Sequence, residues 1–186
     1  MSRLGRIALG TAAAAGYLWA MKQRNAGLRR PPVRDLDGDP YPASTFTFSD
    51  GATVSYLDVG EGPAVLMVPG ADGIKETWRH QVPAFARGHR VVAADLRSEF
   101  PPGTEFDRMA RDLEELADAL GVREAAVVGQ SLGGPVAMRF ALLHPGRVRA
   151  LVLSNTLARV SYEHVGLDRT LLAPVAMAST RYLPTF

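Results

Sequence analysis

Residues 125–134 decide the fold, and their sequence is Ala-Ala-Val-Val-Gly-Gln-Ser-Leu-Gly-Gly. The first four are apolar and typical of a buried strand, and a segment with helical spacing follows as far as His144. Ser131 therefore lies at the turn between a strand and a helix. Glycines at positions 129 and 133 favour a sharp turn, because side chains there would collide with it. This turn predicts a strained backbone at Ser131 and a hydroxyl that points out above the sheet.

Outward from this turn, strand-like and helix-like segments alternate along the chain. A hairpin is expected first, with its turn at Asp50-Gly51. Strands are expected at residues 45–48, 53–59, 64–68, 90–94, 125–128 and 150–153, and helices at 77–85, 104–120 and 132–144. The pattern predicts an α/β fold: a mostly parallel sheet with an amino-terminal hairpin, helices on both faces, and an incomplete sheet after the sixth strand.

The composition is typical of one globular domain. The chain has 186 residues, of which 47% are hydrophobic and 22% are charged. It contains no cysteine, which excludes disulfides, a cysteine nucleophile and thiolate metal sites. Residues 1–34 carry seven basic side chains and no acidic one, whereas residues 35–186 carry 14 basic and 19 acidic ones. The mildly acidic body argues against a nucleic-acid-binding protein.

The basic amino-terminal segment contains an uncharged stretch of fifteen residues, from Ile7 to Met21. Its basic flanks, with Tyr17 and Trp19 near one end, favour a membrane anchor or an interfacial helix. The stretch is shorter than the roughly 20 residues that span a bilayer. A cleaved signal peptide and a soluble alanine-rich helix are the alternatives. We therefore expect membrane association through residues 7–21, with a cytoplasmic or a secreted location as the alternative.

The segment Gly129-Gln130-Ser131-Leu132-Gly133 fits the pattern G-x-S-x-G between a strand and a helix. With this motif, the chain from about residue 44 to its end resembles the α/β-hydrolase family. The resemblance implies that Ser131 is the catalytic nucleophile and that the backbone N–H of Leu132 stabilises an oxyanion. The segment Val68-Pro69-Gly70-Ala71 resembles the family's second oxyanion segment, which implies the N–H of Ala71 as the other donor. Pro69 replaces the family's histidine there.

Two other segments extend the resemblance. Asp95-Leu96-Arg97 resembles the family's Asp-x-Arg-Gly, with Ser98 in place of the glycine, and implies structural roles for Asp95 and Arg97. Leu153-Ser154-Asn155-Thr156 resembles the enol-lactonase branch of the family over four residues. The predicted organisation is then a basic-flanked apolar helix at residues 1–30, a proline- and aspartate-rich linker at 31–43, a hydrolase core at 44–158 and the start of a lid at 159–186.

A serine nucleophile requires a base, and the family supplies it from a histidine and an acid that follow the nucleophile in the chain. His80 and His89 precede Ser131, and His144 is expected to cap the helix after it. His164 follows Ser131 in the region where the family inserts its lid. Asn155, at one position used for the acid, is not a carboxylate. The histidine and the acid are therefore expected beyond residue 186.

The resemblance implies a serine hydrolase that cleaves a carboxylic ester or a lactone through an acyl-enzyme. The 186-residue chain alone is expected to be inactive, because the acid and the histidine are absent from it. Serine instead of aspartate at position 131 argues against the family's epoxide hydrolases and haloalkane dehalogenases. No cofactor is implied, and no histidine–carboxylate cluster has metal-ligand spacing. The alternative hypothesis is a non-catalytic, membrane-associated relic of a hydrolase, or a remnant that only binds a ligand. The substrate, the oligomeric state and the fate of the amino-terminal segment do not follow from the sequence.

Overall fold

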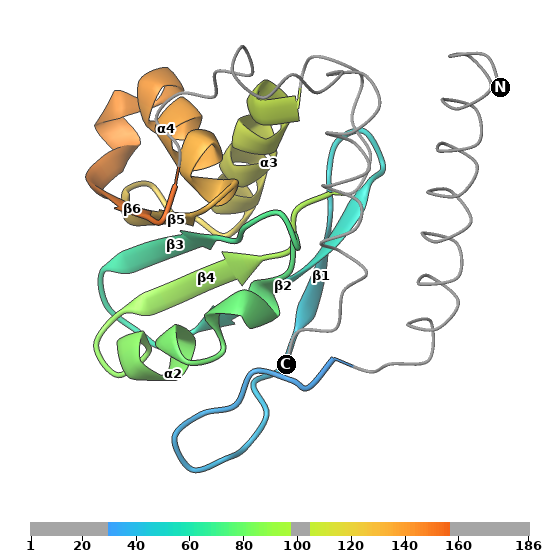
Figure 1. Cartoon of the computed structure of the whole chain (residues 1–186), viewed down its shortest axis with the longest axis vertical. Coiled ribbons are helices and arrows are strands. Elements are labelled where there is room, and N and C mark those ends of the chain that lie inside the picture. The colour runs from blue at the N-terminus through green and yellow to red at the C-terminus, as the bar shows by residue number, and fades with distance from the viewer. Residues whose placement is uncertain (1–29, 98–104, 157–186) are drawn as a thin grey trace, which may run out of the picture. The chain divides into compact units, whose positions relative to one another are not determined.

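The computed structural model of the chain describes residues 30–97 and 105–156 (Figure 1). The helix expected at residues 1–30 and the lid segment expected at residues 159–186 lie outside the described residues, apart from residue 30. Within the described ranges, no helix is both long enough and apolar enough to cross a membrane.

The described residues form a six-stranded sheet with the strand order β1-β2-β4-β3-β5-β6. The strands are β1 (Ser44–Thr47), β2 (Thr53–Val59), β3 (Ala64–Val68), β4 (Arg90–Ala94), β5 (Ala125–Gln130) and β6 (Val148–Ser154). The pair β1–β2 and the pair β2–β4 are antiparallel, whereas β3 pairs in parallel with β4 and β5, and β5 with β6. The predicted α/β fold, with an amino-terminal hairpin and a mostly parallel sheet, is confirmed.

Helices cover both faces of the sheet. Helices α3 (Glu105–Ala119) and α4 (Gly133–Leu143) lie on one face, and η1 (Lys75–Trp78) and α2 (Gln81–Phe85) lie on the other (Figure 1). Strand β3 serves both cores, because Leu66 and Val68 pack toward α3 and α4 while Val65 and Met67 pack toward η1 and α2. Alternation of side chains along a strand explains why a continuous apolar run is buried on both faces.

The single helix expected at residues 77–85 is replaced by the two short helices η1 and α2. Pro83 explains the interruption, because its ring has no N–H to donate to the carbonyl of Arg79 and would collide with that carbonyl in a continuous helix. Helix α4 follows the expectation more closely, since Leu132 and His144 are its two flanking residues.

Residues 31–43, where an extended linker was expected, contain packed residues. Arg34 forms a β-bridge with Pro40, and Val33 is buried in the core that contains α2.

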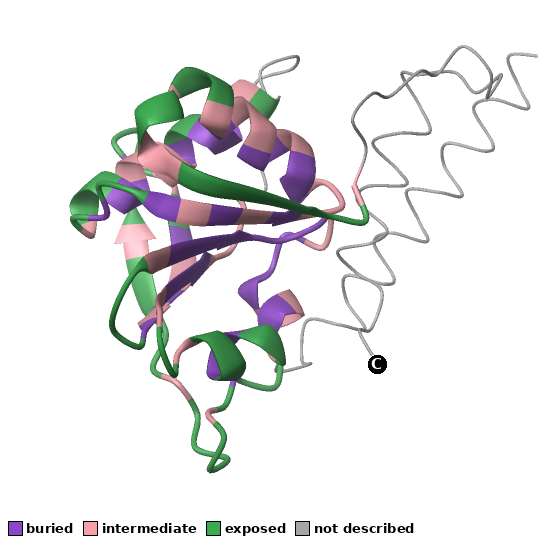
Figure 2. Cartoon of the chain, turned by 90° about the vertical axis from the view of Figure 1, so that its left-hand side faces the viewer, coloured by how far each residue is buried: buried purple, intermediate pink, exposed green. Residues whose placement is uncertain are grey.

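Strand β6 is the last strand of the described sheet, and most of its residues are exposed (Figure 2). Leu151, Val152 and Leu153 retain 38%, 49% and 42% of their exposure.

Candidate active site

The turn at Ser131 connects β5 to α4 and has the strained geometry that the sequence predicts. Ser131 has a φ of 51°, in the left-handed region that residues with a side chain rarely adopt. Its N–H donates to the carbonyl of Ser154 at 3.1 Å, and its carbonyl accepts from the N–H of Gly134 at 3.1 Å and from the hydroxyl of Thr156 at 2.6 Å. These hydrogen bonds fix the backbone of Ser131 from both β6 and α4.

The glycines around Ser131 are required by close backbone contacts. A Cβ atom at Gly129 would collide with the carbonyl of Gly133, and a Cβ at Gly133 would collide with the carbonyls of Val68 and Pro69. The end of β3 thus lies directly against the first turn of α4. Since Val68 pairs with Gly129 in the parallel register, strands β3 and β5 end at the same edge of the sheet.

The amino-terminal end of α4 is directed at the same edge. Helix α4 has eleven residues, and its first N–H groups have no partners within the helix. The N–H of Leu132 has no hydrogen-bond acceptor among the described residues. The helix dipole adds partial positive charge at this end. An anion that forms beside Ser131 would therefore be stabilised there.

A second backbone turn, at residues 70–73, lies beside Ser131. It closes through a hydrogen bond from the N–H of Gly73 to the carbonyl of Gly70 at 2.9 Å. Gly73 has a φ of 65°, which favours glycine. A Cβ at Gly70 would lie 3.3 Å from the Cβ of Ser131. The structure therefore brings together the turn that contains Ala71 and the serine turn, the two segments that the family resemblance pairs.

A buried polar cluster supports the turn at residues 70–73, and most of its members could not be recognised from the sequence. The Nζ of Lys75 lies 2.9 Å from a carboxylate oxygen of Glu76 and 3.5 Å from one of Asp95, and the side chain retains 7% exposure. Asp72 accepts a hydrogen bond from the hydroxyl of Thr77. The sequence signal was weak, because adjacent Lys75 and Glu76 have a pattern that solvent-exposed loops share.

A second buried network surrounds Arg97 behind the site. The guanidinium of Arg97 donates two hydrogen bonds to Asp112 of α3 and two more, at 2.6 and 3.4 Å, to Asp50 in the turn between β1 and β2. Its Cζ lies 4.9 Å from the ring centroid of Phe48. Burial opposes the charge of Arg97, but the hydrogen bonds to Asp112 and Asp50 outweigh it and raise the pKa of the guanidinium. The structural role expected for Arg97 thus has a defined set of partners.

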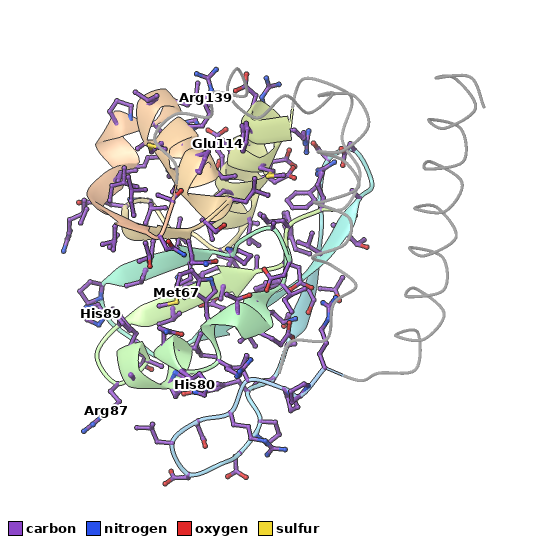
Figure 3. All side chains as sticks on the ribbon, viewed as in Figure 1. Met67, His80, Arg87, His89, Glu114 and Arg139 are labelled. Atoms are coloured by element: carbon purple, nitrogen blue, oxygen red, sulfur yellow. The ribbon has the colours of Figure 1, made fainter. Side chains whose placement is uncertain are left out.

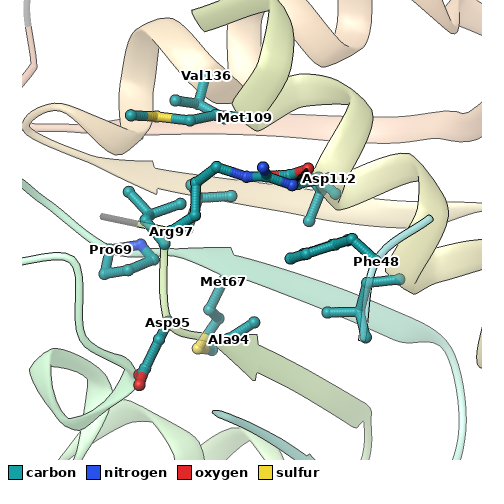
Figure 4. A pocket seen from close by; sticks show the side chains of 13 residues that line it. Phe48, Met67, Pro69, Ala94, Asp95, Arg97, Met109, Asp112 and Val136 are labelled. Atoms are coloured by element: carbon teal, nitrogen blue, oxygen red, sulfur yellow. Dashed lines mark hydrogen bonds and ion pairs between the residues drawn. The ribbon is translucent and has the colours of Figure 1, made fainter. Parts of the chain in front are cut away.

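A small cavity of about 30 Å³ lies between this network and the end of β3. Figure 4 shows the side chains that line it. Apolar side chains, including Pro69, Met109 and Val136, line most of it, together with Arg97 and Asp112. The cavity is large enough for about two water molecules but not for an organic substrate. It therefore does not identify a substrate pocket.

The described histidines all make contacts away from Ser131. His80 accepts a hydrogen bond from Arg79, and His89 packs against the ring of Phe85 at 5.8 Å. Both lie on the α2 side of the sheet, whereas Glu114 lies in α3 (Figure 3). The Nδ1 of His144 is 3.2 Å from Glu114. His164 lies outside the described residues, and within residues 30–97 and 105–156 no histidine contacts Ser131.

No group of three or more histidine, aspartate or glutamate side chains in residues 30–97 and 105–156 could hold a metal ion. The serine turn and the turn at residues 70–73 lie at the carboxyl edge of the parallel strands, where α/β proteins commonly carry their sites.

Among α/β proteins, the chain belongs to the alpha/beta hydrolase fold family, whose model matches residues 63–177. The family resemblance inferred from the serine turn is thereby confirmed. A crystal structure of a hydrolase from Pseudomonas aeruginosa is similar, with a TM-score of 0.60 and 37% identity, and the alignment covers 64% of this chain and 48% of that chain.

Curated relatives have two kinds of named activity. The chain is 33% identical to bifunctional epoxide hydrolase 2 of Sus scrofa over 139 residues, which are 69% of this chain and 25% of that protein. It is 36% identical over 113 residues to a protein of Azorhizobium caulinodans with the provisional name carbamate hydrolase RutD, covering 58% of this chain and 43% of that protein. The chain thus spans less than half the length of these relatives. Neither name specifies an esterase or a lactonase.

Proposed function

We propose that Ser131 is the nucleophile of a serine hydrolase that acts on a carboxylic ester or a lactone. The observation that carries this proposal is the strained backbone of Ser131, with a φ of 51°, at the junction of β5 and α4. The N–H of Leu132 and the turn that contains Ala71 lie at the same edge of the sheet. Family membership adds that hydrolysis is the general reaction.

In the proposed reaction, the Oγ of Ser131 forms a bond to the carbonyl carbon of the substrate. The electron pair of the C=O π bond moves to oxygen, and the N–H groups of Leu132 and Ala71 stabilise the resulting oxyanion. Collapse of this intermediate breaks the bond to the alcohol oxygen, which leaves with a proton, and produces an acyl-enzyme. Water then releases the acid. The proton transfers require a base, which the family order assigns to a histidine that follows Ser131.

Serine at position 131 favours acyl chemistry over epoxide opening, although epoxide hydrolases are among the relatives. Attack of a hydroxyl on an epoxide carbon would form an ether, which water does not readily cleave. Attack of a carboxylate would form an ester, which water can hydrolyse. A carbamate, the substrate class in the name of the relative from Azorhizobium caulinodans, contains a carbonyl carbon that a serine can attack. Ester, lactone and carbamate therefore share the chemistry that Ser131 supports.

Trifluoroacetophenone tests this proposal without requiring turnover. The Oγ of a nucleophilic serine adds to its activated carbonyl, and the product is a tetrahedral hemiketal that fluorine NMR detects. We expect a protein-bound hemiketal signal with the wild-type chain and its loss in Ser131→Ala. Ser154→Ala is the matched control, because Ser154 contacts Ser131 through its backbone carbonyl and should keep the signal. A signal that persists in Ser131→Ala would contradict the proposed nucleophile.

The second candidate is a non-catalytic hydrolase relic that binds a ligand. The observation that favours it is that, in residues 30–97 and 105–156, the hydroxyl of Ser131 makes no hydrogen bond to a histidine. Binding of trifluoroacetophenone without formation of a hemiketal would support this candidate.

Membrane association through residues 7–21 is a separate proposal, and it rests on the basic flanks and the uncharged stretch in the sequence.

A further inference from the structure

The segment that follows β4 makes one hydrogen bond to the turn at residues 70–73, which contains Ala71, and one to Lys75, two residues after that turn. The Oδ1 of Asp95 accepts from the backbone N–H of Lys75 at 2.9 Å. The next residue, Leu96, donates its N–H to the carbonyl of Gly73 at 2.9 Å. We infer that Asp95 is a positioning residue that sets the place of the Ala71 N–H relative to Ser131, an inference that rests on the proposed function.

The path from Asp95 to the reacting atoms is short. The N–H of Leu96 donates to the carbonyl of Gly73, and the N–H of Gly73 donates to the carbonyl of Gly70, which closes the turn. Gly70 lies against the side chain of Ser131, and Ala71 is the next residue along the turn. A displacement at Gly73 or Lys75 would therefore move the donor at Ala71. In a reaction that depends on donor geometry, a shift of about 1 Å is enough to reduce the rate on the order of a hundredfold.

Asp95 is itself held in place from several directions. Its N–H donates to the carbonyl of Ser55 in β2 at 2.9 Å. Two residues later, the buried side chain of Arg97 is fixed by Asp112 and Asp50. Figure 4 shows Asp95 on one side of Pro69 and the Arg97–Asp112 pair on the other. Segment 95–97 is thus a rigid support, as a positioning residue requires.

The alternative role of Asp95 is to neutralise the buried Lys75. The distances argue against this role, because the Nζ of Lys75 is 2.9 Å from Glu76 but 3.5 Å from Asp95. The shorter contact of Asp95 is the one to the backbone N–H of Lys75. The position of an acceptor oxygen, rather than the negative charge, is therefore the property of Asp95 that matters. Two conservative substitutions separate these properties.

Asp95→Asn keeps an oxygen at the Oδ1 position and removes the charge, whereas Asp95→Glu keeps the charge and displaces the oxygen by one methylene. The readout is the pH at which the hemiketal oxygen of the trifluoroacetophenone adduct ionises, followed by fluorine NMR on the 186-residue chain. Oxyanion donors lower this pH, and a purely structural residue would not change it in a folded protein. Asp58→Glu is the matched control, because Asp58 forms a bidentate pair with Arg90 and belongs to neither turn.

We expect Asp95→Asn and Asp58→Glu to ionise like the wild type. We expect Asp95→Glu to ionise at higher pH and to bind the ketone on the order of tenfold to a hundredfold more weakly. Circular dichroism checks that each variant is folded. If Asp95→Glu does not fold, Asp95→Ser replaces it, because the shorter side chain cannot reach the N–H of Lys75. Wild-type behaviour of the Glu or Ser variant, or equal weakening in Asp95→Asn, would overturn the inference. Absence of a Ser131-dependent adduct in the wild type would instead overturn the proposed function.

Discussion

At the scale of single residues, backbone contacts rather than side-chain chemistry determine the site. Ser131 has a left-handed φ that is costly for a residue with a Cβ, by about 1–3 kcal/mol. Hydrogen bonds to Ser154, Thr156 and Gly134 offset that cost. The glycines at 129 and 133 let the end of β3 and the start of α4 approach each other. The strained backbone of Ser131 is therefore held by hydrogen bonds to β6, to Thr156, which follows β6 closely, and to α4.

Gly133→Ala should destabilise the fold, because the added methyl would overlap the backbone carbonyls of Val68 and Pro69, which do not move easily. We expect a loss of about 2 kcal/mol or more in the free energy of unfolding. The matched control is Gly146→Ala, since an added methyl there meets nothing within 4 Å. Urea denaturation of both variants measures the difference. Equal stability of the two variants would show that the close approach at Gly133 is not real.

The serine turn could be predicted from the sequence because its signals are local. Gly129, Ser131 and Gly133 lie within five residues, between an apolar strand and a helix. The partners of Arg97 could not be predicted in this way, because Asp112 is 15 positions away and Asp50 is 47 positions away. Nothing in the local pattern around Asp50 distinguishes it from an ordinary turn residue. Ion pairs between distant segments become visible only when the strand order is known.

At the scale of elements, Arg97 links the turn between β1 and β2 to α3 by ion pairs with Asp50 and Asp112. Hydrogen bonds from Arg97 and from the N–H of Ala52 lower the pKa of Asp50 from 3.8 to about 2. A carboxyl with a lowered pKa stabilises the fold when it is ionised in both states. That stabilisation is present above the unfolded pKa and is lost as the pH falls through the folded value.

Asp50→Asn should therefore lower the melting temperature at neutral pH and have a decreasing effect as the pH falls from about 4 to about 2. Thermal unfolding of the wild type and the variant across this pH range measures the effect. Asp37→Asn is the control, because Asp37 is exposed and its carboxylate has no partner among the described residues. A difference between wild type and Asp50→Asn that stays constant with pH would contradict the role of the Arg97 hydrogen bonds.

Strand β6 is one of the two edge strands of the described sheet, and most of its residues are exposed. It lies at the end of the described sheet, and Leu151, Val152 and Leu153 present apolar side chains on both of its faces. An edge strand without charge at its centre favours pairing with another strand. An apolar run of this kind is suited to the interior of a parallel sheet, where neighbouring strands cover its backbone groups on both sides.

We expect residues 35–186 to self-associate and Val152→Lys to reduce that association, since a charge on an edge strand opposes pairing. Size-exclusion chromatography with light scattering measures the mass. Leu142→Lys is the matched control, because Leu142 is 74% exposed but lies on α4 rather than on the edge. A monomeric wild type, or equal effects of the two substitutions, would show that β6 does not cause association.

At the scale of the whole molecule, the amino-terminal segment and the hydrolase core have separate properties. Residues 1–34 hold seven basic side chains and no acidic one, and the described core begins to pack at Val33. The mostly parallel sheet could be predicted from the alternation of strands and helices, whereas the strand order β1-β2-β4-β3-β5-β6 could not. The break between η1 and α2 follows from Pro83, a local signal that the periodic pattern alone did not reveal.

Deletion of residues 1–30 should change the location of the protein and leave its fold intact. We expect the full chain in the membrane fraction after cell lysis and the deletion variant in the soluble fraction, with equal melting temperatures. A full chain that remains as soluble as the deletion variant would exclude membrane association through residues 7–21. A lower melting temperature of the deletion variant would show that the segment contributes to the core.

Acylation by p-nitrophenyl acetate is a direct test of whether Ser131 is a nucleophile beside an oxyanion site. After brief exposure of the chain to this ester, peptide mapping by mass spectrometry locates the acetyl group. We expect acetylation of Ser131 on the order of a hundredfold to a thousandfold faster than of the other serines, because oxyanion donors stabilise the transition state, and no such adduct in Ser131→Ala. Equal acetylation of Ser131 and the other serines would contradict this expectation.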